Sequence, residues 1–370
     1  MEHKPWYKID HTKNVISPSL LVYPDRIEKN ILQMITIAGG TEFLRPHIKT
    51  YKIAEIIQLQ LKHGIHKFKC ATIAEAELLA ESGAQDVLLA MQPVGANIDR
   101  FFKLINVYPK VQFSTLVDNH KTIDEINDDA IKNEVMVSLF LDINNGMNRT
   151  GIWPGDEALE LYKKMNSCSN IVTEGLHVYD GHLRNPNFDE RKKQCDAAFE
   201  LVIQLKKNIE NAGLKVNTIV AGGTPTFPIH SKRKGVVVSP GTPLLWDQGY
   251  ANLFPELPFL PAAVLFSRII SKPNTNLICF DLGHKSVASE MQFPRVQFLN
   301  INNSKQIRHS EEHLVVECED ADKYQTGDVS YSIPLHICPT VTKYKEVSTV
   351  IDGTITGTYK IVARDHKTTV

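Results

Sequence analysis

The chain has 370 residues, of which 42% are hydrophobic and 22% are charged, and its formal net charge is −1 at neutral pH. This composition is ordinary for a globular enzyme, and the length allows two domains or one large barrel with an addition. The near-zero charge argues against a nucleic-acid or anionic-membrane partner, and no apolar run is long enough to cross a bilayer.

Two elements are predicted before the main body of the chain. Residues 19–23 read as a short apolar strand, and residues 24–38 have the spacing of an amphipathic helix. We expect residues 1–23 to form an N-terminal segment that pairs with a later β domain. The first residues lack the apolar core of a signal peptide.

From about residue 40 to 245, apolar strand-like runs alternate with helix-like stretches, which is the pattern of parallel βα units. Eight strands are predicted, at 43–49, 66–71, 86–91, 111–117, 135–143, 174–179, 216–221 and 235–239. The predicted helices include 52–63, 73–82, 124–132, 156–166 and 189–211, and Thr72 with Glu75 has the spacing of a capping box. Eight such units predict a TIM-type (β/α)8 barrel over residues 24–245. An open doubly wound sheet is the alternative, but no G-x-G-x-x-G follows the first strand.

Beyond residue 246 the helical periodicity fades and strand-like runs take over. Strands are predicted at 263–270, 277–281, 314–318, 349–351 and 358–362, with turns at 272–274, 325–328 and 351–353. We therefore expect an antiparallel β domain over residues 246–370. The six cysteines are scattered and form no CxxC pair, which is typical of free thiols in a reducing compartment such as the cytoplasm.

The segment Arg45–Thr50 places a lysine, Lys49, at the carboxyl end of the first predicted strand. Active sites of βα barrels collect at that end, and a lysine there can serve as an amine nucleophile. A solvated surface lysine is the alternative interpretation on spacing alone.

Two glycine-containing loops follow the last two predicted barrel strands. Gly222-Gly223-Thr224 follows the seventh strand and Gly241-Thr242 follows the eighth, which are the positions where barrels hold phosphate groups. Glycines let backbone N–H groups approach an anion, and threonine hydroxyls add donors. Ordinary turns are the alternative interpretation.

His336 and Cys338 are separated by one residue near the C-terminus. On an extended strand, residues i and i+2 point to the same face, so an imidazole and a thiolate would converge on one metal ion. Thiolate and imidazole together favour zinc over magnesium or calcium, and two protein ligands leave open positions for water or substrate.

Seven segments spread over most of the chain resemble one enzyme family. They are Ser17–Tyr23, Arg45–Thr50, Gly146–Gly151, Gly175–His182, Ala221–Thr224, Glu311–His313 and Pro334–Thr340. In these segments the chain resembles the alanine-racemase-like barrel enzymes that use pyridoxal phosphate, in the branch of D-threonine aldolase and D-serine dehydratase. By this resemblance, Lys49 corresponds to the lysine that forms the Schiff base with the cofactor.

The resemblance also implies the surroundings of the cofactor. It assigns Arg149 to the phenolate oxygen of pyridoxal phosphate, and it places His47 in the cofactor site. Tyr179 and His182 lie at the carboxyl end of the sixth predicted strand, where we expect them to line the cofactor, with a core aromatic as the alternative for Tyr179. The resemblance implies a small-molecule D-amino acid substrate, a divalent metal (zinc, with manganese or magnesium as alternatives) and a homodimer.

Two reactions are compatible with this resemblance. The first is retro-aldol cleavage of a D-threonine-like β-hydroxy amino acid to glycine and an aldehyde, and the second is dehydration of D-serine to pyruvate and ammonia. Cys338 is similar to the dehydratase branch, whereas Pro339-Thr340-Val341 and Glu311–His313 are more similar to the aldolase branch, and Pro243 departs from the aromatic residue expected there. Retro-aldol cleavage is preferred. Racemization and a cofactor-carrier role remain as alternatives, which the metal pair and the long β domain disfavour.

Overall fold

A computed structural model describes residues 5–370, so the part of the predicted N-terminal segment that covers residues 1–4 lies outside the described residues. The chain divides into two compact units. The barrel unit comprises residues 34–241 and 365–370, and the β unit comprises the described residues up to 33 together with 242–364. Among the described residues, no helix is both long enough and apolar enough to cross a membrane.

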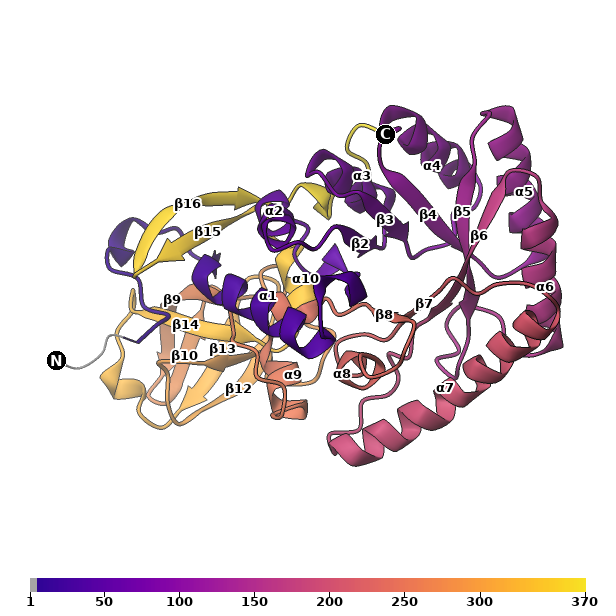
Figure 1. Ribbon diagram of the computed structural model, residues 1–370. Coiled ribbons are helices and arrows are strands. Elements are labelled where there is room, and N and C mark those ends of the chain that lie inside the picture. Colours follow the sequence, from indigo (N-terminus) through magenta and orange to yellow (C-terminus); the bar gives the residue numbers. More distant parts are fainter. Residues whose placement is uncertain (1–4) are drawn as a thin grey trace. The chain divides into compact units, whose positions relative to one another are not determined.

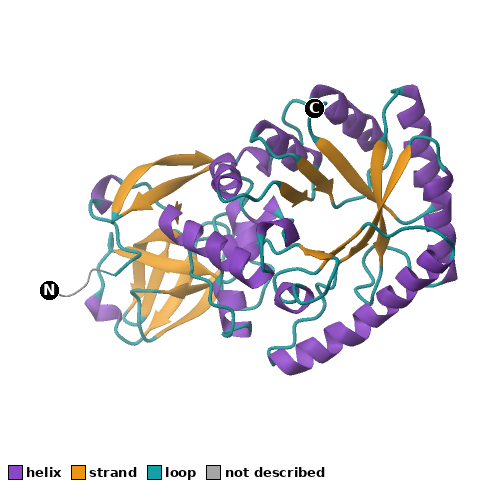
Figure 2. Cartoon of the chain, viewed as in Figure 1, coloured by secondary structure: helices purple, strands orange, loops and turns teal. Residues whose placement is uncertain are grey.

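The barrel unit is a curved sheet of seven parallel strands, with its helices on the outside (Figures 1 and 2). The strands pair in chain order: β2 (Lys67–Cys70), β3 (Asp86–Leu89), β4 (Gln112–Val117), β5 (Val137–Ile143), β6 (Ile171–Val178), β7 (Thr218–Ala221) and β8 (Val236–Val238). The helices are α2 (Ala54–Lys62), α3 (Ile73–Glu81), α4 (Ala96–Val107), α5 (His120–Lys132), α6 (Asp156–Ser167), α7 (Phe188–Asn211) and α8 (Phe227–His230). The alternation of strands and helices confirms the predicted TIM-like class.

The prediction of a first strand over residues 43–49 is wrong in detail. Only two isolated bridges form, Leu44 with Val238 and His47 with Lys69, and Lys49 lies in a 3-10 turn, Ile48–Thr50. Pro46 has no N–H to donate, which limits a regular ladder, but its carbonyl accepts a hydrogen bond from Lys69 N at 2.9 Å. Residues 44–47 therefore lie between β8 and β2 and occupy the place of the eighth strand.

Packing explains why the strands read as apolar runs. Every residue of β5 is buried, as expected for a parallel strand with a helix layer on one side and the barrel interior on the other. The capping box predicted at the start of α3 forms, because the Thr72 hydroxyl accepts a hydrogen bond from Glu75 N at 3.1 Å. The Glu75 carboxylate turns back to accept a hydrogen bond from Ala71 N and pairs with Lys52.

The β unit contains a mostly antiparallel sheet of nine strands. Strand β1 (Ser19–Val22) pairs with β9 in antiparallel fashion and with β15 in parallel fashion, and α1 (Pro24–Ala38) follows it across the unit boundary. The other strands are β9 (Ala263–Asn274), β10 (Leu277–Phe280), β11 (Val296–Phe298), β12 (Ser304–His309), β13 (Leu314–Cys318), β14 (Val329–Pro334), β15 (Glu346–Ile351) and β16 (Thr354–Lys360). Two short helices, α9 (Gln248–Leu253) and α10 (Ile337–Val341), complete the unit.

Two local predictions in this unit are wrong. The turn expected at 272–274 is instead the end of β9, which continues to Asn274, and the chain reverses at the next two residues before β10. His336 and Cys338 do not lie on a strand: β14 ends at Pro334, His336 is the N-cap of α10, and Cys338 lies in the first turn of α10. Pro339 fits that first turn because the N–H groups there have no intrahelical partner.

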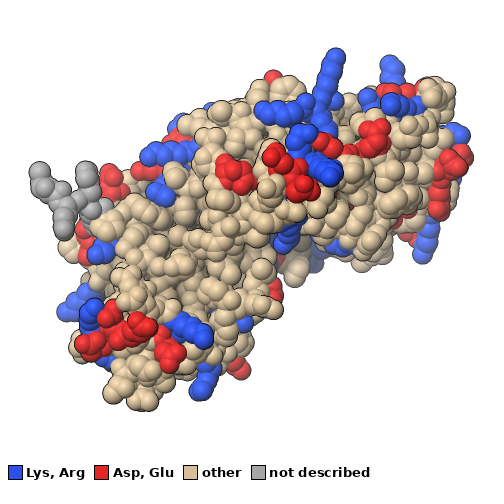
Figure 3. Space-filling view, turned by 90° about the horizontal axis from the view of Figure 1, so that it is seen from below, with Lys and Arg blue, Asp and Glu red and all other residues tan. Residues whose placement is uncertain are grey.

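Charged side chains of both signs are interspersed over the described residues on the face in Figure 3. This distribution agrees with the formal charge of −1 and gives that face no single-sign field.

Candidate active site

Lys49 is positioned by the segment that closes the barrel. Arg45 N and His47 N donate hydrogen bonds to the carbonyls of Val238 and Pro240, both at 2.9 Å, and so hold the segment against the β8 side. The 3-10 turn begins directly after His47, whose ring Nδ1 accepts a hydrogen bond from Lys49 N at 3.3 Å. The half-buried Lys49 therefore lies at the carboxyl end of the barrel strands, where βα barrels carry their active sites.

The aromatic ring of Tyr179, directly after β6, collects three cationic groups. Arg149 Cζ lies 4.8 Å, Lys49 Nζ 5.6 Å and Lys69 Nζ 5.8 Å from the ring centroid. These residues come from the turn after β5, the closing segment and β2. The cation–π geometry brings the predicted residues Lys49, Arg149 and Tyr179 together.

Glycines hold the Tyr179 ring in place. A methyl group at Gly223 would lie 2.9 Å from Tyr179 Cε2, and one at Gly181 would lie 2.5 Å from the phenol oxygen. Both glycines thus permit the ring to pack against backbone, which side chains at these positions would prevent.

The two predicted phosphate loops contact each other within the barrel unit. Gly241 N donates to Thr224 Oγ1 at 3.4 Å, Gly223 N donates to Thr226 Oγ1 at 3.3 Å, and Gly222 has φ 75°, which a residue with a side chain rarely adopts. A methyl group at Gly241 would lie 2.8 Å from the His47 carbonyl oxygen, so this glycine allows the loop to reach the lysine segment. Thr242 belongs to the β unit.

These residues fit a flat, phosphate-bearing aldehyde such as pyridoxal phosphate. The amine of Lys49 and the guanidinium of Arg149 flank one aromatic ring, and the glycine loops meet behind the lysine segment. Two side chains at strand ends, Asn145 after β5 and Ser239 after β8, are buried and carry polar atoms with no hydrogen-bond partner among the described residues. Unpaired buried polar atoms are costly, so they favour a polar ligand at this end of the barrel.

Electrostatics keep the histidine of the lysine motif neutral. Burial, followed by the charges of Lys49 and Lys69, lowers the pKa of His47 well below its ordinary value. A neutral ring agrees with its role as an acceptor for Lys49 N. His182, the other predicted histidine, packs close to Gly146, where an added methyl group would lie 3.1 Å from its Nε2.

Sequence reasoning missed a buried chain of three polar residues inside the barrel. Lys69 Nζ lies 3.4 Å from His177 Nε2, and His177 Nδ1 lies 2.7 Å from Asp142 Oδ1. Burial, and next the charge of Lys49, lower the pKa of Lys69 to about 7. The available signal was Lys69 itself, a lysine within a predicted barrel strand. A lysine inside a barrel almost always has a partner, because an unpaired buried charge is costly.

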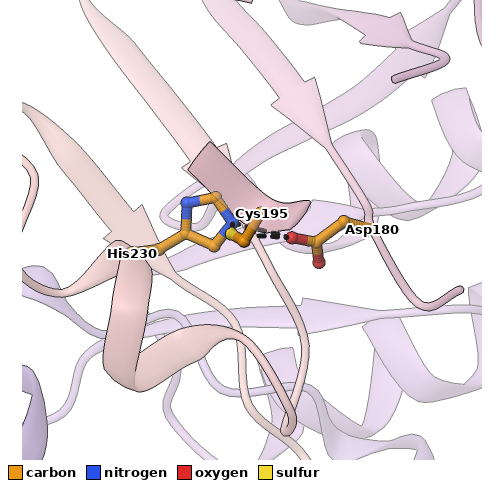
Figure 4. A group of neighbouring side chains, drawn as sticks. All are labelled: Asp180, Cys195 and His230. Atoms are coloured by element: carbon orange, nitrogen blue, oxygen red, sulfur yellow. Dashed lines mark hydrogen bonds and ion pairs between the residues drawn. The ribbon is translucent and has the colours of Figure 1, made fainter. Parts of the chain in front are cut away.

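A second network lies behind the glycine loop at Gly222-Gly223-Thr224. Asp180, Cys195 and His230 offer ligand atoms that lie within 4.8 Å of one another (Figure 4). His230 Nδ1 faces Arg233 at 2.6 Å, and since arginine always donates, His230 Nε2 carries the proton that it donates to Asp180 at 2.8 Å. Arg233 in turn pairs with the carboxylate of the exposed Asp196, so the three side chains belong to a larger hydrogen-bond network.

This network holds the glycine loop in place. The second carboxylate oxygen of Asp180 accepts a hydrogen bond from Thr226 Oγ1 at 2.7 Å, and Thr226 Oγ1 in turn accepts one from Gly223 N. Asp180 is fully buried; burial would raise its pKa, but its interactions with His230 and the hydrogen bond from Thr226 lower it.

The predicted metal pair lies in the β unit. His336 Nδ1 contacts the carboxylate of Glu290, and Cys338 Sγ lies 3.8 Å from Thr242 Oγ1. Burial would lower the pKa of His336, but its hydrogen bond to Cys338, the charge of Cys338, and the carboxylates of Glu290 and Asp247 raise it to about 9. Imidazole and thiolate are ligand types that zinc prefers, so the chemistry of His336 and Cys338 fits a zinc ion. Among the described residues, however, His336, Cys338 and the two carboxylates do not bring three ligand atoms within 4.8 Å of one another.

Two family profiles match the chain, one in the barrel region and one in the β region. The family profile described as "Alanine racemase, N-terminal domain" matches residues 22–247, and the profile described as "Putative serine dehydratase domain" matches residues 262–350. Since the first profile alone spans more than half of the chain, it identifies the family.

Relatives match the chain over nearly its full length. D-threonine aldolase from an Arthrobacter species is 25% identical over 96% of this chain and 94% of its own. The 3-hydroxy-D-aspartate aldolase of Paracoccus denitrificans is also 25% identical, over 94% of this chain and 92% of its own. The crystal structure of D-threonine aldolase from Filomicrobium marinum superposes with a TM-score of 0.88 at 24% identity and covers 95% of this chain and 96% of that chain, which confirms the fold. The chain therefore belongs to the alanine racemase N-terminal-domain family, among the pyridoxal-phosphate-dependent lyases that are similar to D-threonine aldolase.

Proposed function

We propose that the protein cleaves β-hydroxy D-amino acids by a retro-aldol reaction, in the manner of a D-threonine aldolase, with pyridoxal phosphate and a divalent metal. The observation that supports this most is the convergence of Lys49 and Arg149 on the Tyr179 ring at the carboxyl end of the barrel. Residues 24–245 would bind the cofactor and residues 246–370 would carry the metal ligands. Two relatives that match over nearly the full length are named D-threonine aldolase and 3-hydroxy-D-aspartate aldolase.

Each cofactor-site residue has a distinct role in this proposal. Lys49 supplies the amine that holds the cofactor, and Arg149 offers a planar, permanently charged donor to the phenolate oxygen. Tyr179 packs against the flat ring, and His47 fixes the Lys49 turn through its ring acceptor. Gly222, Gly223, Thr224, Gly241 and Thr242 would hold the phosphate.

In the reaction the Cα–Cβ bond of the substrate breaks, the β-hydroxyl loses its proton, and Cα gains one, so that glycine and an aldehyde are released. Pyridoxal phosphate, when bound, accepts the electron pair of the broken bond. A zinc ion held by His336 and Cys338 would favour loss of the hydroxyl proton. The amine of Lys49 would be the group of this chain that moves a proton at Cα.

The test is incubation of the purified protein, loaded with pyridoxal phosphate and zinc, with D-threonine and D-serine in separate reactions. We expect glycine and acetaldehyde from D-threonine, loss of product with a chelator, and loss of product in Lys49→Ala. L-allo-threonine formed from D-threonine would indicate an epimerase, and no product would favour a cofactor carrier. Retained cofactor and activity in Lys49→Ala would contradict the assignment of the lysine.

Dehydration of D-serine is the second candidate, and two observations favour it. The metal pair contains Cys338, and the profile that matches residues 262–350 is described as a putative serine dehydratase domain. Pyruvate and ammonia from D-serine, at a rate above that of aldehyde release from D-threonine, would replace the aldolase proposal. The homodimer remains a proposal as well, which light scattering of the loaded protein tests.

A further inference from the structure

We propose that Asp118 is a positioning residue of the cofactor site: its carboxylate anchors the loop after β5 and thereby holds Arg149 against the Tyr179 ring. Asp118 does not contact the cofactor in this proposal. The inference rests on the proposed function, because it concerns the arginine that would bind the phenolate oxygen of pyridoxal phosphate. The anchoring of the loop, which is its structural half, is measurable without the cofactor.

The loop that carries Arg149 is closed at its base by backbone hydrogen bonds. Asn144 N and Ile152 N donate to the carbonyls of Ile152 and Asp142, both at 2.9 Å, so the two ends of the loop lie side by side. Gly151 makes this closure possible, because its φ is 90° and an added methyl group would lie 2.8 Å from Asn144 N. The residues between Asn144 and Gly151, Arg149 among them, therefore form a loop that starts and ends at one place.

Asp118 holds the second end of this loop from the neighbouring strand. It directly follows β4, and its Oδ2 accepts a hydrogen bond from Gly151 N at 3.0 Å. At the first end, the Asn144 side chain accepts hydrogen bonds from two backbone N–H groups of the loop, the second being that of Asn148 at 2.9 Å. Arg149 lies between these two anchors, one residue after Asn148 and two residues before Gly151.

A glutamine after β3 keeps the Asp118 carboxylate in this orientation. Gln92 Nε2 donates to Asp118 Oδ1 at 3.1 Å, and Gln92 Oε1 accepts from Asp118 N at 3.0 Å. The neighbouring Asn119 donates to Asp118 Oδ1 at 2.9 Å, while its own Oδ1 caps α5 by accepting from Thr122 N. Two amide groups thus donate to Oδ1, and Oδ2 faces Gly151 N.

Arg149 depends on such an anchor because its side chain is long and exposed. Its guanidinium carbon lies 4.8 Å from the Tyr179 centroid, and a cation–π contact at an exposed site is too weak to order a long side chain by itself. A fixed loop presents the guanidinium to an anion with less loss of conformational entropy on binding. Loss of the Asp118 contact should therefore weaken the contribution of Arg149 to cofactor binding.

The primary experiment is a double-mutant cycle on cofactor affinity. The dissociation constant of pyridoxal phosphate is measured by absorbance titration of the cofactor-free full-length protein. We expect Asp118→Ala to weaken binding by on the order of tenfold, the size of a lost hydrogen bond to a charged group. In the Arg149→Met background the same substitution should have no further effect, because the arginine through which Asp118 acts is gone.

The matched control is Asp128→Ala, because Asp128 is an exposed aspartate on α5. Its affinity should equal that of the parent protein in both backgrounds. Equal losses from Asp118→Ala with and without Arg149 would overturn the inference, since a merely structural role acts independently of the arginine. An Asp118→Ala affinity equal to the control would overturn it as well. If the unchanged protein binds no pyridoxal phosphate at Lys49, the proposed function fails instead.

A second measurement needs no cofactor. Trypsin cleaves after arginine, so its rate at the Arg149–Thr150 bond reports opening of the loop, and cleavage after Arg184, which is exposed after β6, serves as the internal reference. Asp118→Ala should raise the rate at Arg149 by on the order of tenfold and leave the rate at Arg184 unchanged. Equal acceleration at both bonds, or none at Arg149, would show that Asp118 does not anchor the loop.

Asp118→Asn provides the conservative variant for both experiments. It keeps one oxygen that can accept from Gly151 N, so its losses should be smaller than those of Asp118→Ala. If the alanine variant does not fold, the asparagine variant takes its place in the cycle and in the cleavage assay. An asparagine variant that matches the unchanged protein in both backgrounds and one that loses affinity equally in both would each count against the inference, the first only where Asp118→Ala also shows no loss or does not fold.

Discussion

At the scale of single residues, the barrel unit is notable for two carboxylates that remain charged despite burial. Asp142 pairs with His177 and Asp180 pairs with His230, at 2.7 and 2.8 Å. Burial acts to raise the pKa of each carboxyl group, yet the histidine partners outweigh it and both pKa values are lowered. A buried charge with a partner contributes to stability only while it is ionised, so both pairs are points of acid sensitivity.

Asp180 gives a pH-dependent prediction. Because its pKa is lowered on folding, its contribution to stability is fully present above the pKa of the unfolded chain, about 4, and is lost as the pH falls below that value. We expect Asp180→Ala to lower the free energy of unfolding at pH 7 by about 3 kcal/mol, since it removes the buried anion to which His230 and Thr226 donate and leaves those donors unpaired. Urea unfolding, followed by the fluorescence of the three tryptophans, measures this difference.

The difference between Asp180→Ala and the unchanged protein should shrink below pH 4, while the exposed control Glu319→Gln should show little difference at either pH. A difference of equal size at pH 7 and at pH 3.5 would show that the loss comes from packing and not from the charge. The glycine loop provides an independent check, because Thr226 connects Asp180 to Gly223 and looser cofactor binding should accompany the substitution.

At the scale of elements, the sequence predicts correctly those helices and strands whose own residues show the periodicity of the element. The amphipathic spacing of residues 24–38 matches α1 at both ends, and the apolar runs of the barrel match β2 to β8 within a few residues. Strand β12 was missed because its sequence, Ser304–His309, is mostly polar and contains no buried residue. Helix α10 was missed because its first turn depends on Asp247, which accepts a hydrogen bond from Ile337 N and is distant in sequence.

The same distinction separates the predicted and the missed parts of the site. The lysine motif and the glycine loops each lie in one short segment and could be recognised there. The chain of Lys69, His177 and Asp142 draws one residue from each of three strands, and only the pairing registers bring Lys69 opposite His47 and Asp142 opposite His177. No single-segment pattern contains that information.

Gly241 gives a prediction about the contact between the last barrel loop and the lysine segment. In Gly241→Ala the new methyl group would lie 2.8 Å from the His47 carbonyl oxygen and 3.3 Å from Thr50 Oγ1, so one segment must move. We expect a loss of about 1–3 kcal/mol of stability and weaker retention of pyridoxal phosphate, measured by thermal unfolding and by absorbance after dialysis. In the control Gly357→Ala the nearest side-chain atom, Thr349 Oγ1, is 3.7 Å away, so stability and cofactor retention should be unchanged.

Thr72 gives a smaller prediction at the start of α3. Its hydroxyl satisfies Glu75 N, so Thr72→Ala should lower the free energy of unfolding by about 1 kcal/mol, whereas Thr72→Ser keeps the acceptor and should cost less. Chemical denaturation of the two variants measures the difference. Equal losses for Ala and Ser would mean that the threonine methyl group, and not the cap, matters.

At the scale of the whole molecule, the candidate ligands for the cofactor and for the metal belong to different compact units, except that Thr242, a candidate phosphate ligand, lies in the β unit with the metal pair. Lys49, His47, Arg149, Tyr179 and the glycine loops through Gly241 lie in the barrel unit, whereas Thr242, His336 and Cys338 lie in the β unit. Each unit has its own buried core. The metal ligands of the β unit therefore do not form part of the fold that surrounds the cofactor residues of the barrel unit. It follows that the two groups should load separately.

Separate loading of the cofactor and the metal gives a prediction about the roles of the two units. Cys338→Ser removes the thiolate ligand without removing volume, so it should abolish zinc binding, measured by elemental analysis, and abolish lyase activity. It should leave the absorbance of pyridoxal phosphate attached at Lys49, because none of the barrel-unit contacts to Lys49 involves Cys338. The matched control is Cys168→Ser, a half-buried free thiol of the barrel unit, which should keep zinc, cofactor and activity. If Cys338→Ser instead releases the cofactor together with the metal, then cofactor binding requires the metal-bearing unit, and the lysine, arginine and glycine contacts of the barrel would be insufficient to hold pyridoxal phosphate.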